Sequence, residues 1–247
     1  MVDRLRAAGC VFAEDEARLL VSATASDDEL EALVARRVAG EPLEYVLGWV
    51  EFGGLRLAIE SGVFVPRRRT EFLARSAATV VHPGDVLVDL CCGCGAVAAA
   101  VAAAVPGVEV HALDVDAAAV RCARRNVSGA VYLGDLYSAL PDVLRGRVCA
   151  VTGNAPYVPT EALSTMPVEA RVHEPRVALD GGADGLDVLR RIIAGAPEWL
   201  RPGGWLFVES STAQAPRLVE QMASAGLDAT VRTDDEVGGT VVAGRLG

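Results

Sequence analysis

The chain contains 247 residues, of which 51% are hydrophobic, so it is long enough for one complete α/β domain with a small additional segment. The formal net charge of −10 argues against tight generic binding to nucleic acid, because neutralisation of phosphates dominates that affinity. No apolar run is long enough to span a membrane, and the start of the chain lacks the pattern of a signal peptide. We therefore expect a cytoplasmic monomer with no membrane partner and no nucleic-acid partner.

The first 40 residues predict helices, because apolar side chains recur at 3- and 4-residue spacing. Ser26 is a good helix start, and Gly40-Glu41-Pro42 ends the helical region. Two short strand-like runs, 50–52 and 55–59, flank Gly53-Gly54 and predict a β-hairpin. These patterns divide the chain into a helical segment 1–45, a hairpin linker 46–66 and a main domain 67–247.

The main domain alternates between helical and strand patterns. Helices are expected at about 70–81, 96–104, 116–126, 186–199 and 213–225, and strands at about 86–90, 108–113, 130–133, 148–152, 205–209, 228–233 and 240–246. Strands that alternate with helices favour a parallel sheet with right-handed crossovers. We therefore predict a Rossmann-like α/β fold around a seven-stranded sheet, with the N-terminal helical segment and hairpin attached.

A glycine turn follows the strand at 86–90. Gly93 and Gly95 allow the backbone to turn sharply and to approach a ligand closely. Asp89, just before the turn, is placed to face the ammonium group of an amino-acid-bearing cofactor, and it would repel a pyrophosphate. Asp114 comes 19 residues after Gly95, at a spacing that suits a bidentate grip on ribose hydroxyls. Asp135, after the third strand, is placed to contact an adenine amino group.

S-adenosylmethionine carries an ammonium group, a ribose and an adenine, so the three aspartates in this order predict that cofactor. The turn alone is weaker evidence, since Gly93-x-Gly95-x-x-Ala98 also matches the dinucleotide fingerprint. Cys91-Cys92-Gly93-Cys94 contains a C-x-x-C, but no second ligand pair accompanies it. We therefore read the cysteines as reduced thiols that suit a tight turn and expect no metal.

A second polar motif, Asn154-Ala155-Pro156-Tyr157, follows the strand at 148–152, and in a doubly wound sheet both motifs open onto one crevice. An amide nitrogen is a poor nucleophile, so an enzyme that methylates one must accept hydrogen bonds from its NH2 group. Asn154 offers a side-chain oxygen and residue 155 a backbone carbonyl. Pro156 stiffens the loop, and Tyr157 is suited to lie against the flat amide. By itself the tetrapeptide is an ordinary turn.

In their order along nearly the whole chain, these motifs resemble the HemK-like protein-(glutamine-N5) methyltransferases, which modify peptide chain release factors. The resemblance is carried by 4–9, 40–45 with Gly48, 64–67 before Thr70-Glu71, 89–95, Asp114, 154–157, 174–179, 185–187 and 201–204. It implies the Rossmann-like methyltransferase fold and a protein substrate. It also implies that Cys91, Cys92, Gly93, Cys94, Gly95 and Asp114 bind S-adenosylmethionine, that Leu136 lies near its adenine, that Asn154, Ala155, Pro156 and Tyr157 bind the glutamine, and that 1–45 docks the substrate.

The chain departs from the family pattern at several positions, which indicates a divergent branch. Ala155 stands where Asn-Pro-Pro-Tyr has its first proline, and cysteines occupy turn positions that usually hold glycine and threonine or serine. Arg68 and Arg69 replace a proline and an acidic residue, and the usual arginine is absent around 238–240.

Two alternatives stay open at the level of sequence. An N6-adenine methyltransferase acts on a similar planar NH2 group, and Arg67-Arg68-Arg69 would then contact phosphate. A non-catalytic protein that binds S-adenosylmethionine would explain Ala155 and the unusual turn.

Overall fold

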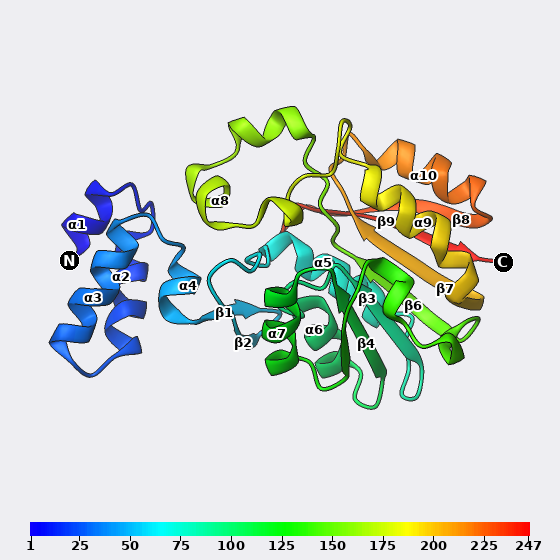
Figure 1. Cartoon of the computed structure of the whole chain (residues 1–247), viewed down its shortest axis with the longest axis horizontal. Helices are drawn as coiled ribbons and strands as arrows, with labels where there is room; N and C mark the ends of the chain where they lie inside the picture. The colour runs from blue at the N-terminus through cyan, green and yellow to red at the C-terminus, as the bar shows by residue number, and fades with distance from the viewer.

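The computed structural model describes residues 1–247, and its larger sheet has seven strands in the order β5-β4-β3-β6-β7-β9-β8. The strands from β5 to β7 are parallel, whereas β9 runs antiparallel to both of its neighbours. The predicted seven-stranded Rossmann-like fold is confirmed (Figure 1). The strand bounds are β3 Val86–Leu90, β4 Glu109–Asp114, β5 Ala130–Leu133, β6 Val148–Gly153, β7 Leu200–Glu209, β8 Leu227–Asp234 and β9 Gly239–Leu246.

Helices cover both faces of this sheet, because its strands are apolar on both sides. Leu87 belongs to one core layer, and its neighbours Val86 and Val88 belong to the other, as the alternation of side chains along a strand requires. The first layer packs on α5 Glu71–Ala78, α6 Ala96–Ala104 and α7 Ala117–Asn126, and the second packs on α9 Asp187–Trp199 and α10 Ala215–Ser224.

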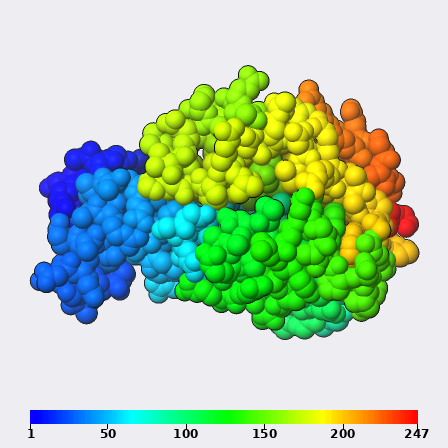
Figure 2. Space-filling view, in the orientation of Figure 1, coloured from blue at the N-terminus to red at the C-terminus, as the bar shows by residue number.

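The N-terminal helices form a lobe of their own, drawn in blue at one end of the molecule in Figures 1 and 2. Its small core includes Leu5, Leu20 and Val34. The side chain of Ser26 accepts a hydrogen bond from the backbone of Glu29, which confirms the predicted helix start. The helices are α1 Val2–Ala7, α2 Ala13–Ala23, α3 Asp27–Val38 and α4 Leu43–Leu47, and the boundary expected at residue 45 falls inside the unpredicted α4.

The predicted hairpin is present as β1 Trp49–Phe52 and β2 Leu55–Ala58, with Gly53 and Gly54 at positive φ between them. Asn126, at the end of α7, exchanges two hydrogen bonds of 2.8 Å with the backbone of Ala58. The same side chain donates a 2.8 Å hydrogen bond to the carbonyl of Cys94. One amide therefore ties the hairpin to the glycine turn of the main domain.

Several predicted boundaries were wrong. The helix expected at 70–81 ends at Ala78, and a 3-10 turn, η1 Arg68–Thr70, precedes it. Strand β7 starts at Leu200 rather than at 205, because the Pro-Gly-Gly stretch lies in a bulge of the strand and not in a loop. The sequence also missed α8 Val168–His173 and the 3-10 turns η2 Leu136–Ala139, η3 Asp142–Leu144, η4 Thr160–Thr165 and η5 Arg176–Ala178, which are too short to show a helical period. None of the helices combines the length and the apolar character that crossing a bilayer demands.

Candidate active site

The two predicted motifs start from paired positions of adjacent strands. Leu90, the last residue of β3, lies opposite Gly153, the last residue of β6. The strands β4 and β5 are added in sequence on one side of β3. The next strand, β6, lies on the other side of β3, so the strand order reverses between β3 and β6. Ligands of doubly wound sheets bind at such a reversal of strand order, outside the carboxyl ends of the strands.

A cavity of about 310 Å³ opens at this reversal and is lined by residues of both motifs. Three predicted site residues do not line it: Gly95, Ala155 and Tyr157. Its walls also contain residues that sequence reasoning did not assign, including Phe64, Pro66, Thr70, Pro175, Val177, Ala178 and Arg191. The predicted residues that do line it are Asp89, Cys91, Cys92, Gly93, Cys94, Asp114, Asp135, Leu136, Asn154 and Pro156.

Gly95 allows the glycine turn to pack closely against Val127. Its φ is +82°, and a Cβ atom built on it would lie 2.5 Å from Cγ2 of Val127. Gly93 contributes its backbone N–H, which donates a 2.9 Å hydrogen bond to Oδ2 of Asp114. The turn after β3 is therefore fixed to the end of β4 by backbone and side chain together.

Two non-glycine residues have positive φ, Cys91 at 55° and Leu136 at 51°, and both line the cavity. This region of backbone conformation is unfavourable for residues with a Cβ atom, and such strain gathers at ligand sites. The chain thus holds two strained positions at one cavity, one after β3 and one after β5.

The aspartates differ in environment. Asp89 is 1% exposed and accepts hydrogen bonds from Oγ1 of Thr152 at 2.7 Å and from the backbone of Ala98 at 3.2 Å. Burial raises the pKa of Asp89 to about 7 and also raises the pKa of Asp114. Asp135 is exposed instead, and its carboxylate lies 2.7 Å from the guanidinium of Arg191.

The cavity is electrically suited to a cation. Four carboxylates line it, those of Asp89, Asp114, Asp116 and Asp135, against the single guanidinium of Arg191. This excess of negative charge would repel the pyrophosphate of a dinucleotide and attract the sulfonium and ammonium groups of S-adenosylmethionine. The residues present therefore fit that cofactor.

Asn154 presents a free acceptor at the cavity. Its Nδ2 donates a 3.2 Å hydrogen bond to Oγ1 of Thr70, while no protein donor reaches its Oδ1. Ala155 is 2% exposed within the core, and its backbone carbonyl is likewise without a protein donor. Of these two oxygens, Oδ1 of Asn154 belongs to a residue that lines the cavity, so it is the one placed to meet another molecule.

Tyr157 lies beside the cavity rather than in its wall. Its hydroxyl donates a 3.0 Å hydrogen bond to Oε1 of Glu209 and accepts one of 2.8 Å from Nη2 of Arg69. Burial, followed by the Glu209 carboxylate, raises the pKa of Tyr157 to about 12. The prediction that this ring lies against the substrate amide stays a prediction.

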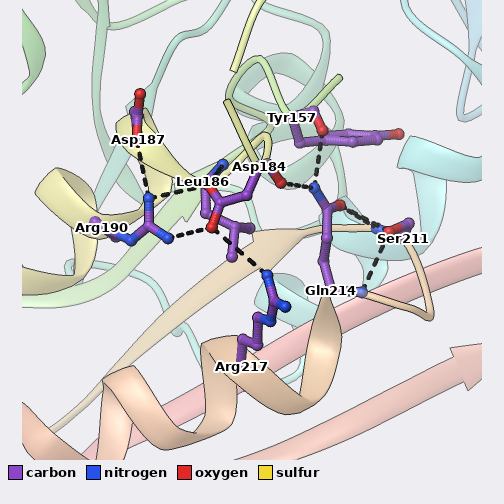
Figure 3. A network of polar contacts seen from close by, with 8 residues as sticks. All are labelled: Tyr157, Asp184, Leu186, Asp187, Arg190, Ser211, Gln214 and Arg217. Atoms are coloured by element: carbon purple, nitrogen blue, oxygen red, sulfur yellow. Dashed lines mark hydrogen bonds and ion pairs between the residues drawn. The ribbon is translucent and has the colours of Figure 1, made fainter. Parts of the chain in front are cut away.

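Gln214 holds the end of the tetrapeptide, a role that sequence reasoning missed (Figure 3). Its Nε2 donates to the backbone carbonyls of Tyr157 at 2.9 Å and Asp184 at 3.2 Å. Its Oε1 accepts a 2.7 Å hydrogen bond from Oγ of Ser211. A lone glutamine before a helix gives no sequence signal, so only the tertiary contacts show this role.

Comparison with known proteins gives the class of the chain. Residues 55–182 match the family model described as "Methyltransferase small domain". A solved methyltransferase from Pyrococcus furiosus shares the fold with a TM-score of 0.59 at 17% identity, over 78% of this chain and 90% of that one. The chain is a methyltransferase, and its cofactor is S-adenosylmethionine.

Curated relatives narrow this class to a family. The release factor glutamine methyltransferase of Geobacter sulfurreducens is 38% identical over 221 residues, which cover 87% of this chain and 77% of that protein. The protein of the same description from Streptomyces coelicolor is 42% identical over 189 residues, covering 74% and 67%. The chain belongs to the release factor glutamine methyltransferase family, which confirms the resemblance read from the motifs, and the comparisons do not support the adenine-methylating alternative.

Proposed function

We propose that this protein transfers the methyl group of S-adenosylmethionine to the side-chain amide nitrogen (N5) of a glutamine in a peptide chain release factor. The observation that carries the proposal is the orientation of Asn154. Its nitrogen is engaged by Thr70, and its oxygen, at the cavity, has no donor from the protein. That oxygen is available to accept a hydrogen bond from the NH2 group of the substrate amide.

The chain supplies position and electrostatics to the transfer. Asn154 Oδ1 and the carbonyl of Ala155 accept hydrogen bonds from the NH2 group, which keeps electron density on the nitrogen and aims its lone pair. Pro156 lines the cavity, fixes its own φ and restricts the backbone of Ala155, the residue before it. When bound, S-adenosylmethionine supplies an electrophilic methyl group on its sulfonium sulfur. The amide proton leaves to solvent after transfer, so the site requires no strong general base.

The cofactor is held by the other wall of the cavity. Asp89 would hold the ammonium group, and Asp114, which orders the Cys91–Gly95 turn, would accept hydrogen bonds from the ribose hydroxyls. Asp135 would contact the adenine amino group, and Leu136 would provide an apolar surface for the ring.

The direct test incubates the purified protein with methyl-labelled S-adenosylmethionine and the release factor of the same organism. We expect label on one glutamine, located by tandem mass spectrometry, and none on a release factor in which that glutamine is replaced. Asn154→Ala should lower kcat by about 100-fold, the usual loss when one preorganised hydrogen-bonding partner is removed, with cofactor affinity unchanged. Label that enters only an oligonucleotide, or no macromolecule at all, would refute the proposal.

The N-terminal segment 1–45 is proposed to dock the acceptor protein. Its helix α3 contacts α8, next to the cavity wall, through an ion pair of 3.3 Å between Arg37 and Glu169. Val11 and Phe12 are exposed on the same segment, at 84% and 68%, and offer an apolar contact. Phe12→Asp should raise KM for the release factor and leave kcat unchanged, whereas an unchanged KM would exclude this contact. We also propose that the protein is a monomer, so light scattering should give a mass near 25.7 kDa.

A further inference from the structure

The 3-10 turn η1 contacts the tetrapeptide 154–157 at both of its ends. Thr70 accepts the 3.2 Å hydrogen bond from the side chain of Asn154, the first residue. Arg69, the residue before it, donates from Nε and Nη2 to the hydroxyl of Tyr157, the last residue, at 3.1 and 2.8 Å. Two adjacent residues thus hold the tetrapeptide in a clamp, which we call the η1 clamp.

The Arg69 side of the clamp includes a buried carboxylate. Glu209 is 1% exposed, and its Oε1 accepts hydrogen bonds from Nε of Arg69 and from the hydroxyl of Tyr157. Its other oxygen, Oε2, is buried without a partner. Arg69 is the one cation paired with this carboxylate, so removing its charge would leave Glu209 uncompensated in the core.

The clamp is seated on the sheet through Gly239, at the start of β9. A Cβ atom at this position would lie 2.9 Å from the carbonyl oxygen of Arg69 and 2.9 Å from Cβ of Phe72. The absence of a side chain at 239 therefore lets η1 pack directly against the strand. Arg68, between Arg67 and Arg69, is exposed, and its guanidinium makes no hydrogen bond or ion pair.

We propose that Arg69 is a positioning residue for methyl transfer, which acts through Tyr157 and Glu209 to hold the tetrapeptide in the geometry that the substrate amide requires. This inference rests on the proposed function and deepens it. Small displacements of a binding group reduce the rate steeply, because transfer needs the nitrogen in line with the methyl group.

Arg69→Met is the test and Arg68→Met its matched control. We expect Arg69→Met to lower kcat on the release factor by about 10-fold or more, with the cofactor Kd from calorimetry within twofold of wild type. For Arg68→Met, both kcat and the cofactor Kd should stay within twofold of wild type. Arg69→Lys keeps the charge near Glu209 and should recover part of kcat. Gly239→Ala, which pushes on η1 from the sheet, should lower kcat without removing any polar group.

A double-mutant cycle identifies the route of the effect. If Arg69 acts through the hydroxyl of Tyr157, then Arg69→Met combined with Tyr157→Phe should lower kcat no more than the worse single variant. Losses in kcat that multiply, or an Arg69→Met variant that equals Arg68→Met, would overturn the inference.

Hydrogen–deuterium exchange separates this inference from the proposed function, because it requires no substrate. Peptides that cover 154–158 should exchange faster in Arg69→Met than in wild type and Arg68→Met. Unchanged exchange would overturn the η1 clamp. A wild-type protein that leaves release factors unmethylated while exchange responds to Arg69→Met would refute the substrate and support the clamp.

Discussion

The side-chain amide of Gln214 lies 2.9 Å from the backbone carbonyl of Tyr157, so the N-terminus of α10 is tied to the end of the 154–157 loop. Gln214 is only 9% exposed, and the carbonyls it serves belong to two separate loops. Loss of this amide would leave two partly buried carbonyl oxygens without donors.

Gln214→Leu should therefore destabilise the protein by about 2 kcal/mol, the cost of unsatisfied buried acceptors. For a chain of this size that corresponds to a fall in Tm of about 4–8 °C, measurable by scanning calorimetry. Arg217→Ala is the control in the same network, since its exposed ion pair with Asp184, at 3.6 Å, is worth less than about 1 kcal/mol. Equal Tm values for the two variants would contradict the role of Gln214.

Cofactor binding should release a proton from Asp89. Burial raises the pKa of this carboxyl from 3.8 to about 7, so the folded protein keeps a proton there that the unfolded chain loses near pH 3.8. The Asp89 contribution to stability of the free protein therefore falls as pH rises from 3.8 to about 7. An ammonium group beside Asp89 favours the ionised form, so cofactor affinity should rise as the pH rises toward about 7 and level off above it.

Calorimetry at about pH 6 in two buffers of different ionisation enthalpy measures this proton. Wild type should release close to one proton per cofactor bound, and Asp89→Asn should release markedly less. A binding enthalpy of wild type that does not depend on the buffer would show that Asp89 is already ionised or lies away from the ammonium.

Gly95→Ala should abolish cofactor binding, because a Cβ atom at this position meets Val127 at 2.5 Å in addition to the strain of a positive φ. Gly54→Ala is the matched control: its φ is +77°, and nothing lies within 4 Å of a Cβ there. The control should lose only about 1–2 kcal/mol of stability from backbone strain and should bind S-adenosylmethionine normally. Similar values of the S-adenosylmethionine Kd for the two variants would show that the structure shifts to make room for the Cβ atom beside Val127.

Breaking the Arg67–Glu174 pair should destabilise the cavity wall. Glu174 has a side chain only 2% exposed, and both of its oxygens lie 2.7 Å from Nη2 of Arg67. Arg67→Leu leaves this carboxylate buried and unpaired, at a cost of about 3 kcal/mol in chemical denaturation. The double variant Arg67→Leu/Glu174→Leu no longer has the unpaired carboxylate and should recover part of that stability. If the double variant loses as much unfolding free energy as the two single variants added together, then Arg67 stabilises the protein by packing alone.

The sequence predicted those residues of the cavity that lie at or beside the ends of strands. Asp89, Asp114 and Asn154 each follow or end an apolar run, and parallel strands bring their carboxyl ends to one edge. Tyr157 was assigned to the substrate from its place in the motif, but the direction of a side chain after Pro156 depends on distant partners. Its hydroxyl is directed by Glu209, 52 residues away, and by Arg69, 88 residues away.

The order of apolar runs and turns was enough to predict the Rossmann-like sheet, because this depends on local backbone preferences and on the period of burial. The family came from the resemblance of the motifs, and cofactor binding by the Cys91–Gly95 turn stays a prediction. Tertiary structure alone decided how the 154–157 loop is held. Its supports come from two distant parts of the chain, the adjacent residues Arg69 and Thr70 on one side of the sequence and Gln214 on the other, and no sequence spacing relates them to the loop. Hydrogen bonds between residues far apart in the chain are fixed only when the strands and helices that carry them have packed.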